Sequence, residues 1–408
     1  MTIAFYTLGC KLNFAETSSL AAQAAVRGYS VVDFNSPADI YVINTCTVTA
    51  AAEKKCRQTI SRAVRSGGRV AVVGCFAQLR PEEIKKIAGV TFVLGTDNKN
   101  KLFDLLEQKS ETPTEEDSFI PVYSTTGRTR AFFKIQDGCN NFCTYCAVPY
   151  ARGRSRSATI VRTIEVARKM AADGIKEAIF TGVNIGDFGH ENGENLAGLI
   201  KELLRIDDIE RYRISSIEPD LLTTEIIEMV ANEKKLMPHF HIPLQSGSND
   251  ILADMHRHYK RELFAEKIAF IRNKIPDAFI AADVIVGFPT ETVKLFNETY
   301  EFLQSLDISA LHVFTYSPRP EAASSHIKPL NTAAERKDRS EKLHIFSQRK
   351  KEEFYKKFRG SKALVLWEGH EDNHGNTPQY MYGYTENYLR IRAPFDTAKI
   401  NTVESVII

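Results

Sequence analysis

The sequence contains no apolar run long enough to cross a membrane, and it carries almost no net charge. A bilayer span needs roughly 18 or more consecutive apolar residues, and no such run occurs in the chain. We therefore expect no membrane partner. The 53 Lys and Arg residues against 51 Asp and Glu residues leave a formal charge of +2, so any nucleic-acid site has to be a local basic patch. With 43% hydrophobic and 25% charged residues, the composition is that of a folded globular chain and not of a disordered one.

A secretory signal is also missing. Leu8, Gly9 and Cys10 superficially resemble the end of a lipoprotein signal, but no basic residue precedes Lys11, and the segment is too short for separate charged and apolar regions. The chain has 7 cysteines. Without a signal peptide, such cysteines are expected to be reduced thiols that bind metals or carry redox chemistry, and not a disulfide framework. We therefore expect a cytoplasmic protein.

Residues 1–106 alternate short apolar runs with amphipathic stretches. The runs Ile3 to Tyr6, Asp39 to Asn44 and Arg69 to Gly74 are typical of strands, which predicts a parallel sheet with crossover helices.

Three cysteines follow these strands directly, namely Cys10, Cys46 and Cys75. Because the C-terminal ends of parallel strands gather at one edge of a sheet, we expect the three thiols to converge. Cys56 lies inside a helical stretch, and we interpret it as a buried small apolar residue.

The segment 107–130 is polar and rich in turn-forming residues, which predicts a linker. Residues 131–358 alternate strand-like and helical segments and predict about six β/α units, fewer than the eight of a closed barrel. The strand-like segments are Ala131 to Gln136, Lys176 to Gly182, Arg211 to Ile217, Pro238 to Leu244, Ala278 to Val286 and Ala310 to Thr315. Residues 361–408 return to alternating runs and predict a small all-β domain. The fold class is therefore α/β with an all-β tail.

Three closely spaced cysteines, Cys139, Cys143 and Cys146, follow the first barrel strand and a glycine turn. Thiolates are soft ligands that select iron-sulfur clusters or zinc. A structural zinc site normally closes its coordination with a fourth nearby Cys or His, and none follows within the next few residues. The spacing favours a four-iron cluster with one open iron, and a zinc-containing, non-catalytic nucleic-acid-binding protein remains the alternative.

With these cysteines in place, the chain resembles the radical S-adenosylmethionine (SAM) methylthiotransferase family along essentially its whole length. The motifs that carry the resemblance are Gly9-Cys10-Lys11-Leu12-Asn13, Asn44-Thr45-Cys46, Gly74-Cys75, Gln136-Asp137-Gly138-Cys139, His241-Ile242-Pro243-Leu244-Gln245-Ser246-Gly247-Ser248, Asp283 to Pro289 and Phe314 to Ser317. The resemblance implies an N-terminal methylthiotransferase domain, a partial (β/α)6 radical-SAM barrel and a C-terminal TRAM-like barrel.

The resemblance also implies the cofactors and the reaction. Cys139, Cys143 and Cys146 would hold a 4Fe-4S cluster whose open iron binds SAM and generates a 5'-deoxyadenosyl radical. Cys10, Cys46 and Cys75 would hold a second 4Fe-4S cluster that carries the sulfur to be inserted. The radical would remove hydrogen from carbon 2 of an adenine, and a methylthio group would take its place.

Polar residues after the barrel strands become candidate SAM contacts under this resemblance, because sites in β/α barrels lie at the strand C-termini. They are Asn184, Ser216, Glu218, Gln245, Val286 and Gly287. Four of them also have a structural interpretation: Gly287 as a turn, Gln245 as a loop amide, and Ser216 with Glu218 as the start of a helix.

The substrate has to present an unstacked adenine, which is easiest in the single-stranded loop of a tRNA anticodon stem-loop. Arg152, Arg154 and Arg156 after the barrel triad, and Lys350 and Lys351 in the basic stretch 335–360, are candidate phosphate contacts. The basic stretch is equally compatible with a solvated helix face. Aromatic residues of the tail suit either a core or a stacking surface.

The first motif, with Lys11 after Cys10, resembles members that act on N6-threonylcarbamoyladenosine, and a cationic side chain suits the carboxylate of that modification. The isopentenyladenosine enzyme is the alternative. The family resemblance further implies an electron donor such as flavodoxin or ferredoxin, and we expect a monomer.

Overall fold

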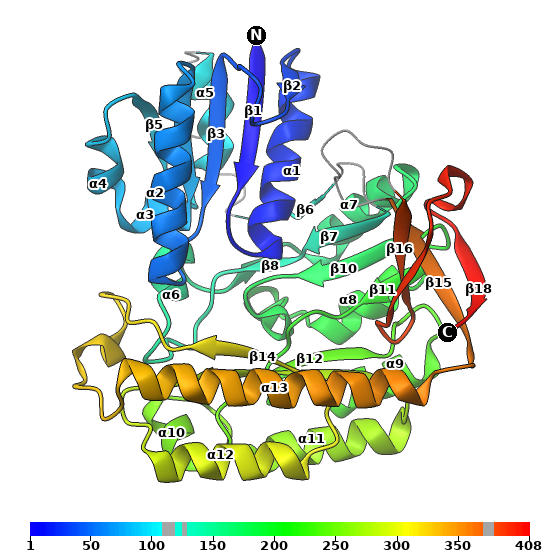
Figure 1. Cartoon of the computed structure of the whole chain (residues 1–408). Coiled ribbons are helices and arrows are strands. Elements are labelled where there is room, and N and C mark those ends of the chain that lie inside the picture. The colour runs from blue at the N-terminus through cyan, green and yellow to red at the C-terminus, as the bar shows by residue number, and fades with distance from the viewer. Residues whose placement is uncertain (108–118, 125–128, 370–378) are drawn as a thin grey trace.

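The structure is a computed structural model that describes residues 1–107, 119–124, 129–369 and 379–408. In Figure 1 the N-terminal domain lies above the barrel, and the C-terminal strands lie against one side of the barrel. No helix among these residues is long and apolar enough to cross a membrane.

The N-terminal domain is a five-stranded parallel sheet with the strand order β2-β1-β3-β4-β5. Its strands are β1 (Thr2–Thr7), β2 (Ser30–Val32), β3 (Ile40–Thr45), β4 (Arg69–Gly74) and β5 (Val90–Leu94). Its helices are α1 (Lys11–Val26), α2 (Ala50–Arg65), α3 (Cys75–Leu79), α4 (Pro81–Lys85) and α5 (Leu102–Leu106). The three predicted strands form the centre of the sheet. The two that the sequence analysis missed are edge strands, which are only half covered and so lack a continuous apolar run.

The barrel contains the six predicted parallel strands in chain order. They are β7 (Arg130–Lys134), β10 (Glu177–Thr181), β11 (Arg211–Arg213), β12 (His239–Gln245), β13 (Phe279–Val286) and β14 (Ala310–Thr315). Two bridges, Tyr212 to Leu236 and Ser216 to His241, join the half that ends at β11 to the half that begins at β12. The barrel is therefore open between β7 and β14, as expected for six units.

Helices cover the outside of these strands. They are α7 (Ile160–Ala172), α8 (Leu196–Leu203), α9 (Thr224–Asn232), α10 (Asn249–Asp254), α11 (Arg261–Lys274), α12 (Val293–Ser305) and α13 (Ala333–Lys357). The short helix α6 (Val148–Arg152) instead follows the barrel cysteine loop and packs on α3 of the N-terminal domain. Thr159, Thr223, Thr292 and Thr332 accept a hydrogen bond from a first-turn amide and so start four of these helices. The basic stretch 335–360 is thus mostly the long helix α13, which packs on β14.

The tail forms a four-stranded antiparallel sheet in the order β17-β16-β15-β18. Its strands are β15 (Lys362–Glu368), β16 (Tyr380–Thr385), β17 (Arg390–Pro394) and β18 (Val403–Ile407). Together with the parallel-sheet domain and the partial barrel, this half-barrel confirms the predicted fold class.

The predicted linker, 107–130, lies partly outside the described residues. Its described part includes β6 (Val122–Tyr123), which pairs antiparallel with β7, so this part of the segment adds a strand to the barrel sheet. A second short pair, β8 (Gln136–Asp137) with β9 (Arg156–Ser157), encloses the barrel cysteine loop.

Candidate active site

The N-terminal cysteines lie at the ends of three adjacent strands. Cys10 precedes α1 after β1, Cys46 follows β3, and Cys75 begins α3 after β4. Cys10 and Cys75 are near enough for their charges to affect the Cys46 thiol, whose pKa burial raises to about 11. The structure thus brings these three predicted residues together.

Asn13 connects two of the strand ends that carry these cysteines, although no role was predicted for it from the sequence. Its side-chain amide donates to the Leu8 carbonyl at 2.8 Å and to the Thr45 carbonyl at 3.0 Å, which joins the ends of β1 and β3. Its Oδ1 atom faces the Cys10 sulfur at 3.8 Å. Gly9, with φ of 110°, leaves room for this approach, since a Cβ atom there would lie 2.8 Å from the Cβ of Cys46.

The barrel cysteines share one loop between β8 and α6. Gly138, at φ of 70°, allows the tight start of the loop, because a Cβ there would collide with the Arg154 carbonyl oxygen. The amide of Asn141 points at the Cys139 sulfur at 3.5 Å, and that of Val148 at the Cys146 sulfur at 3.4 Å.

Arg257, which the sequence analysis did not single out, completes this set of donors at 3.1 Å from the Cys143 sulfur. Donors aimed at sulfur suit thiolates bound to an iron-sulfur cluster. Sequence motifs could not identify Arg257, because it lies 114 positions from the cysteine that it contacts.

The spacing of the sulfur atoms argues against a single zinc ion. Among the described residues, three potential ligand atoms lie within 4.8 Å of one another only in the group His241, Asp283 and His312. The sulfurs of neither cysteine triad are that close together. Zinc holds thiolates at about 2.3 Å, so three sulfurs around one ion would be separated by only about 4 Å. A larger centre fits both triads better.

The predicted SAM contacts lie at the C-terminal ends of the barrel strands. Asn184 is buried, and its Oδ1 atom has no hydrogen-bond partner in the described structure. An unpaired buried acceptor is costly and suits a ligand donor. Ser216 follows β11 and bridges to His241.

Gln245 ends β12 with φ of 66°, at a register shift between β12 and β13. Strained positions of this kind are common at functional sites.

Three other predicted SAM contacts are already engaged with protein. Glu218 forms an ion pair with Arg257, and burial raises the pKa of this carboxyl to about 7. The Gly287 amide donates to Glu291 at 3.0 Å, and the side chain of Arg336 fills the space in front of its Cα. Val286 is fully buried. Their roles as SAM contacts stay predictions.

A cavity of about 210 Å³ connects the two triads. It lies between the N-terminal domain and the barrel and includes Cys75 from one triad and Cys146 from the other. Its lining residues are Thr47, Val48, Thr49, Cys75, Tyr145, Cys146, Ala147, Val148, Ala151, Gln245, Asp283, Ile285, Phe314, Thr315, Tyr316 and Ser317. One cysteine of each triad therefore faces the same space.

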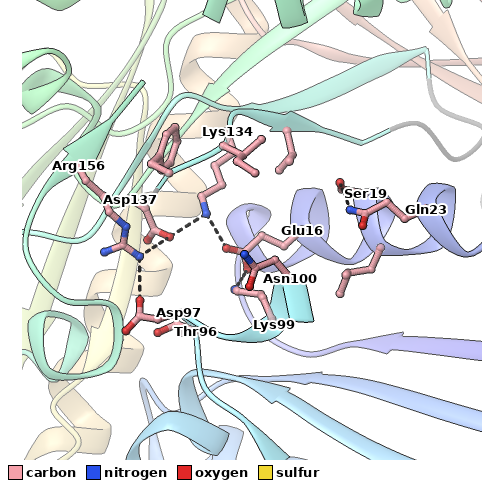
Figure 2. Close-up of a pocket in the computed structure, with 14 residues that line it drawn as sticks. Glu16, Ser19, Gln23, Thr96, Asp97, Lys99, Asn100, Lys134, Asp137 and Arg156 are labelled. Carbon is pink, nitrogen blue, oxygen red and sulfur yellow. Dashed lines mark hydrogen bonds and ion pairs between the residues drawn. The ribbon is translucent and has the colours of Figure 1, made fainter. Parts of the chain in front are cut away.

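A network of buried charges fastens the two domains beside a second cavity, of about 160 Å³ (Figure 2). Glu16 on α1 accepts from Lys134 at 2.8 Å, from Lys99 at 2.5 Å and from Arg152 at 3.2 Å. Asp137, two residues before Cys139, pairs with Lys134 at 2.8 Å and with Arg152 at 2.9 Å.

Arg152 therefore has different surroundings from those that the sequence predicted. It is only 2% exposed, and its guanidinium group contacts Asn13, Glu16 and Asp137. Because every one of these partners lies inside the domain junction, Arg152 does not offer its charge to an RNA phosphate. The expectation of an RNA contact at Arg152 is corrected accordingly: this residue ties α1 to the loop of the barrel triad.

The other predicted RNA contacts are more accessible. Arg154 is exposed beside the barrel triad, and Arg156 is half-buried and paired with Asp97 at 3.2 Å. Lys351 on α13 is exposed, whereas the Lys350 ammonium group donates to the Leu306 carbonyl at 3.2 Å. Leu306 precedes β14, so these lysines lie near the end of the barrel opposite the cysteines.

Tail aromatics form part of a domain interface. The guanidinium of Arg130 lies 4.0 Å from the ring centroid of Tyr384, and that of Arg213 lies 4.9 Å from that of Tyr388. Arg130 also pairs with Glu368 at 2.9 Å. Tyr388 also contacts His239 and Phe279, which begin β12 and β13, so this part of the tail lies at the N-terminal ends of those strands.

Two protein-family models match separate parts of the chain. Residues 2–95 match the uncharacterized protein family UPF0004, and residues 133–303 match the Radical SAM superfamily. The second match implies SAM and a 4Fe-4S cluster.

Solved structures with this fold include a radical SAM methyltransferase, TsrM from Kitasatospora setae. It has a TM-score of 0.57 and 14% identity, over 79% of this chain and 77% of that one. The cobalamin-dependent SAM radical enzyme OxsB has a TM-score of 0.54 and 12% identity, over 83% of this chain and 56% of that one. At these identities the likeness concerns the fold alone.

Curated relatives are similar over nearly the whole chain. The threonylcarbamoyladenosine tRNA methylthiotransferase MtaB of Aquifex aeolicus is 39% identical, over 96% of this chain and 98% of its own length. The MtaB protein of Bacillus subtilis is 38% identical, over 96% and 90%. A tRNA-2-methylthio-N(6)-dimethylallyladenosine synthase of Pseudothermotoga lettingae is 34% identical, over 90% and 88%. The chain thus belongs to the radical SAM family of tRNA methylthiotransferases, and it is an enzyme.

Proposed function

We propose that this enzyme methylthiolates carbon 2 of N6-threonylcarbamoyladenosine next to the anticodon of tRNA. Relatives named for this substrate match at 39%, 38% and 35% identity. Relatives named for dimethylallyladenosine match at 34%, 34% and 32%. The observation that carries the proposal is the single cavity shared by Cys75 and Cys146, because sulfur insertion needs both cysteine triads at one adenine.

Two 4Fe-4S clusters are part of the proposal, one on Cys139, Cys143 and Cys146, and one on Cys10, Cys46 and Cys75. When bound, the barrel cluster with SAM supplies a 5'-deoxyadenosyl radical, and the N-terminal cluster carries the sulfur. Burial raises the pKa of Cys139 to about 11 and that of Cys146 to about 12, so these thiols release protons when they bind iron.

The chain's own residues orient the reactants and exclude water from them. Asn184, Ser216, Glu218, Gln245, Val286 and Gly287 are the proposed SAM contacts, at the C-terminal ends of the strands. The Asn184 Oδ1 atom is the best supported of these, because it is a buried acceptor without a protein partner in the described structure.

The charge network of Glu16, Lys134, Asp137 and Arg152 fixes the distance between the two triads. Such positioning matters because small displacements of reacting groups cost much of the rate.

The remaining partners are part of the same proposal. Arg154, Arg156, Lys350 and Lys351 are the proposed phosphate contacts of the tRNA anticodon stem-loop. An electron donor such as flavodoxin or ferredoxin supplies the reducing electron, and the enzyme acts as a monomer in the cytoplasm.

The test is an anaerobic assay of the reconstituted protein on anticodon stem-loops that carry either the threonylcarbamoyl or the isopentenyl modification. Mass spectrometry of the nucleosides is expected to find the methylthio product with the threonylcarbamoyl substrate. Product from the isopentenyl substrate alone would contradict the proposal. Two clusters predict about eight irons per chain, whereas a colourless protein with stoichiometric zinc would restore the non-catalytic alternative.

A further inference from the structure

The inside of the barrel holds a group of polar side chains to which the proposed chemistry gives no role. His241, Asp283 and His312 lie on the neighbouring strands β12, β13 and β14. Side chains alternate along a strand, and Ile242 and Val284 pack into the core under the helices, so the three polar residues face the opposite side, the barrel lumen.

Hydrogen bonds within this group decide which imidazole nitrogens carry hydrogen. Asp283 Oδ1 lies 2.5 Å from His241 Nε2 and 3.1 Å from His312 Nδ1. Burial alone would raise the pKa of Asp283, but the two histidines outweigh that effect and lower it to about 2. A carboxylate only accepts, so both contacting nitrogens are donors, and Nε2 of a neutral His312 is an acceptor. The His312 side chain is 48% exposed.

Lys11 reaches the lumen from the N-terminal domain. Its Nζ atom lies 5.9 Å from the ring centroid of Phe132, which alternates on β7 with the core residue Phe133. The charges of Asp283, Arg130 and Arg213 all act on this ammonium group. Lys11 is exposed at the start of α1, and its ammonium group is therefore accessible between α1 and β7.

Lys11 differs from the other cations of the lumen in lacking an anionic partner. Arg213 pairs with Glu177 at 2.8 Å, and Arg130 pairs with Glu368 at 2.9 Å. In the described part of the chain, Lys11 has no hydrogen bond or ion pair. A carboxylate that binds there would supply the missing partner through a charge-assisted hydrogen bond.

The histidine group borders the cavity lined by Cys75 and Cys146, and apolar side chains pack at the other end of the lumen. Asp283 belongs both to the histidine group and to the cavity lining. At the opposite end, Phe354 of α13 and Leu389 of the tail pack against Phe279 at the start of β13. A substituent on the base in the cavity therefore has one direction in which to extend.

We propose that Lys11 and His312 form the specificity site for the threonylcarbamoyl group, with Lys11 binding its carboxylate and His312 Nε2 accepting from its hydroxyl group. This inference rests on the proposed function. Asp283 and His241 are positioning residues, because they hold the His312 ring. An isopentenyl group has neither polar function and would leave the Lys11 ammonium unpaired, and an unpaired polar group of this kind rejects an analogue strongly.

The experiment pairs protein variants with substrate analogues, using reconstituted holoenzyme and three anticodon stem-loops. One carries the natural threonylcarbamoyl group, one has its carboxylate converted to an amide, and one carries a glycylcarbamoyl group that lacks the hydroxyl. RNA affinity is measured by fluorescence anisotropy with S-adenosylhomocysteine present, and KM and kcat are measured separately.

The wild-type enzyme is expected to prefer the natural group over the amide by ~10- to 100-fold in affinity, as for a charge-assisted hydrogen bond. It should prefer the threonyl over the glycyl form by ~3- to 10-fold, as for a neutral one. Lys11→Met should abolish only the first preference, and His312→Leu only the second. Each loss should appear in KM and not in kcat.

Lys86→Met is the matched control, because Lys86 is an exposed lysine on the outer side of the same domain as Lys11. It should keep both preferences. Since Lys11 follows Cys10, the iron content of each variant is measured first. If Lys11→Met loses iron, Lys11→Arg and the His312→Leu comparison decide the proposal.

Several results would overturn the inference. A wild-type enzyme that binds the natural, amide and glycyl forms equally would contradict it while leaving the proposed function intact. A metal ion beyond the expected iron that disappears in His312→Leu would assign the histidine group to metal binding. A wild-type enzyme that acts only on the isopentenyl stem-loop would instead refute the proposed function.

Discussion

The barrel triad is contained in one loop that runs from Cys139 to Cys146, whereas the N-terminal triad is assembled from the ends of β1, β3 and β4. The barrel loop is held by its own glycine turn and by amides that point at the sulfurs. The N-terminal sulfurs depend on sheet register and on Asn13, which connects two strand ends. One centre is encoded locally, and the other depends on the fold of a whole domain.

This difference extends to how the two centres are connected. Glu16 belongs to the N-terminal domain and Asp137 to the barrel, and Lys134 and Arg152 bind both carboxylates. The connection therefore includes a network of buried charges beside apolar contacts such as that between Phe14 and Phe132. Buried ion pairs fix geometry but are sensitive to the loss of one partner.

The largest expected effect is a difference in activity between variants of the two triads. Cys143→Ala should abolish both the formation of 5'-deoxyadenosine and methylthiolation, because the barrel triad is the proposed site of SAM cleavage. Cys10→Ala should leave SAM cleavage intact and abolish methylthiolation alone. Both products are measured by chromatography with mass spectrometry on anaerobically reconstituted protein.

Cys56→Ala is the matched control for these variants. Cys56 is fully buried, as the sequence analysis predicted, and its sulfur lies 3.4 Å from the Cys46 carbonyl oxygen. It should keep both activities. Loss of both activities in Cys10→Ala, with the iron of the barrel cluster retained, would show that the two triads do not divide the work as proposed.

A second, smaller effect concerns the connection between the two regions. Glu16→Gln removes the carboxylate that binds Lys99, Lys134 and Arg152, and leaves their charges buried. The apparent free energy of unfolding in urea should fall by about 3–5 kcal/mol. The control, Glu165→Gln, removes an exposed ion pair with Arg162 and should cost less than about 1 kcal/mol. Equal effects of the two substitutions would contradict a structural role for the network.

The same variant predicts a pH dependence. Burial would raise the pKa of Glu16, but Arg152, Lys134 and Lys99 hold it well below its usual value of 4.5. Because the pKa is lower in the folded chain, the stabilisation is present above about pH 4.5 and is lost as the pH falls through the folded-state pKa. The difference in melting temperature between wild type and Glu16→Gln should therefore be constant from neutral pH down to about pH 4.5. It should become smaller as the pH falls below about 4.5. A difference that widens in acid would contradict the assignment.

The smallest effect concerns RNA binding near and far from the triads. Arg154→Ala beside the barrel loop and Lys351→Ala on α13 should each weaken stem-loop binding a few-fold. Each should also lower the slope of log affinity against log salt by about 1, as expected for one phosphate contact. A loss at Arg154 with none at Lys351 would confine the RNA to the cysteine end of the barrel.

Strand positions in the barrel could be predicted from the regular alternation of strand-like and helical segments. The strands themselves are not continuous apolar runs, since β12, for example, carries His239 and His241. The edge strands β2 and β5 were missed, because they are short and half exposed. The cysteine loop could be recognised from spacing alone. The roles of Asn13, Arg257 and His312 could not, because their partners lie on other elements.

One short basic segment shows that local sequence does not reveal which side chains are buried. It contains Arg152, Arg154 and Arg156. In the sequence they are equivalent parts of one basic segment. In the structure Arg152 is buried against Glu16, which is 136 positions away, while Arg154 is exposed.

By itself, the sequence determined the barrel, the local cysteine loop and the position of three further cysteines at strand ends. Only the tertiary structure decided which of the described cations are paired inside the protein, and that Lys11 faces the lumen with no partner among the described residues. Burial and ion pairing depend on groups that the fold brings together from distant positions, and no local pattern records them.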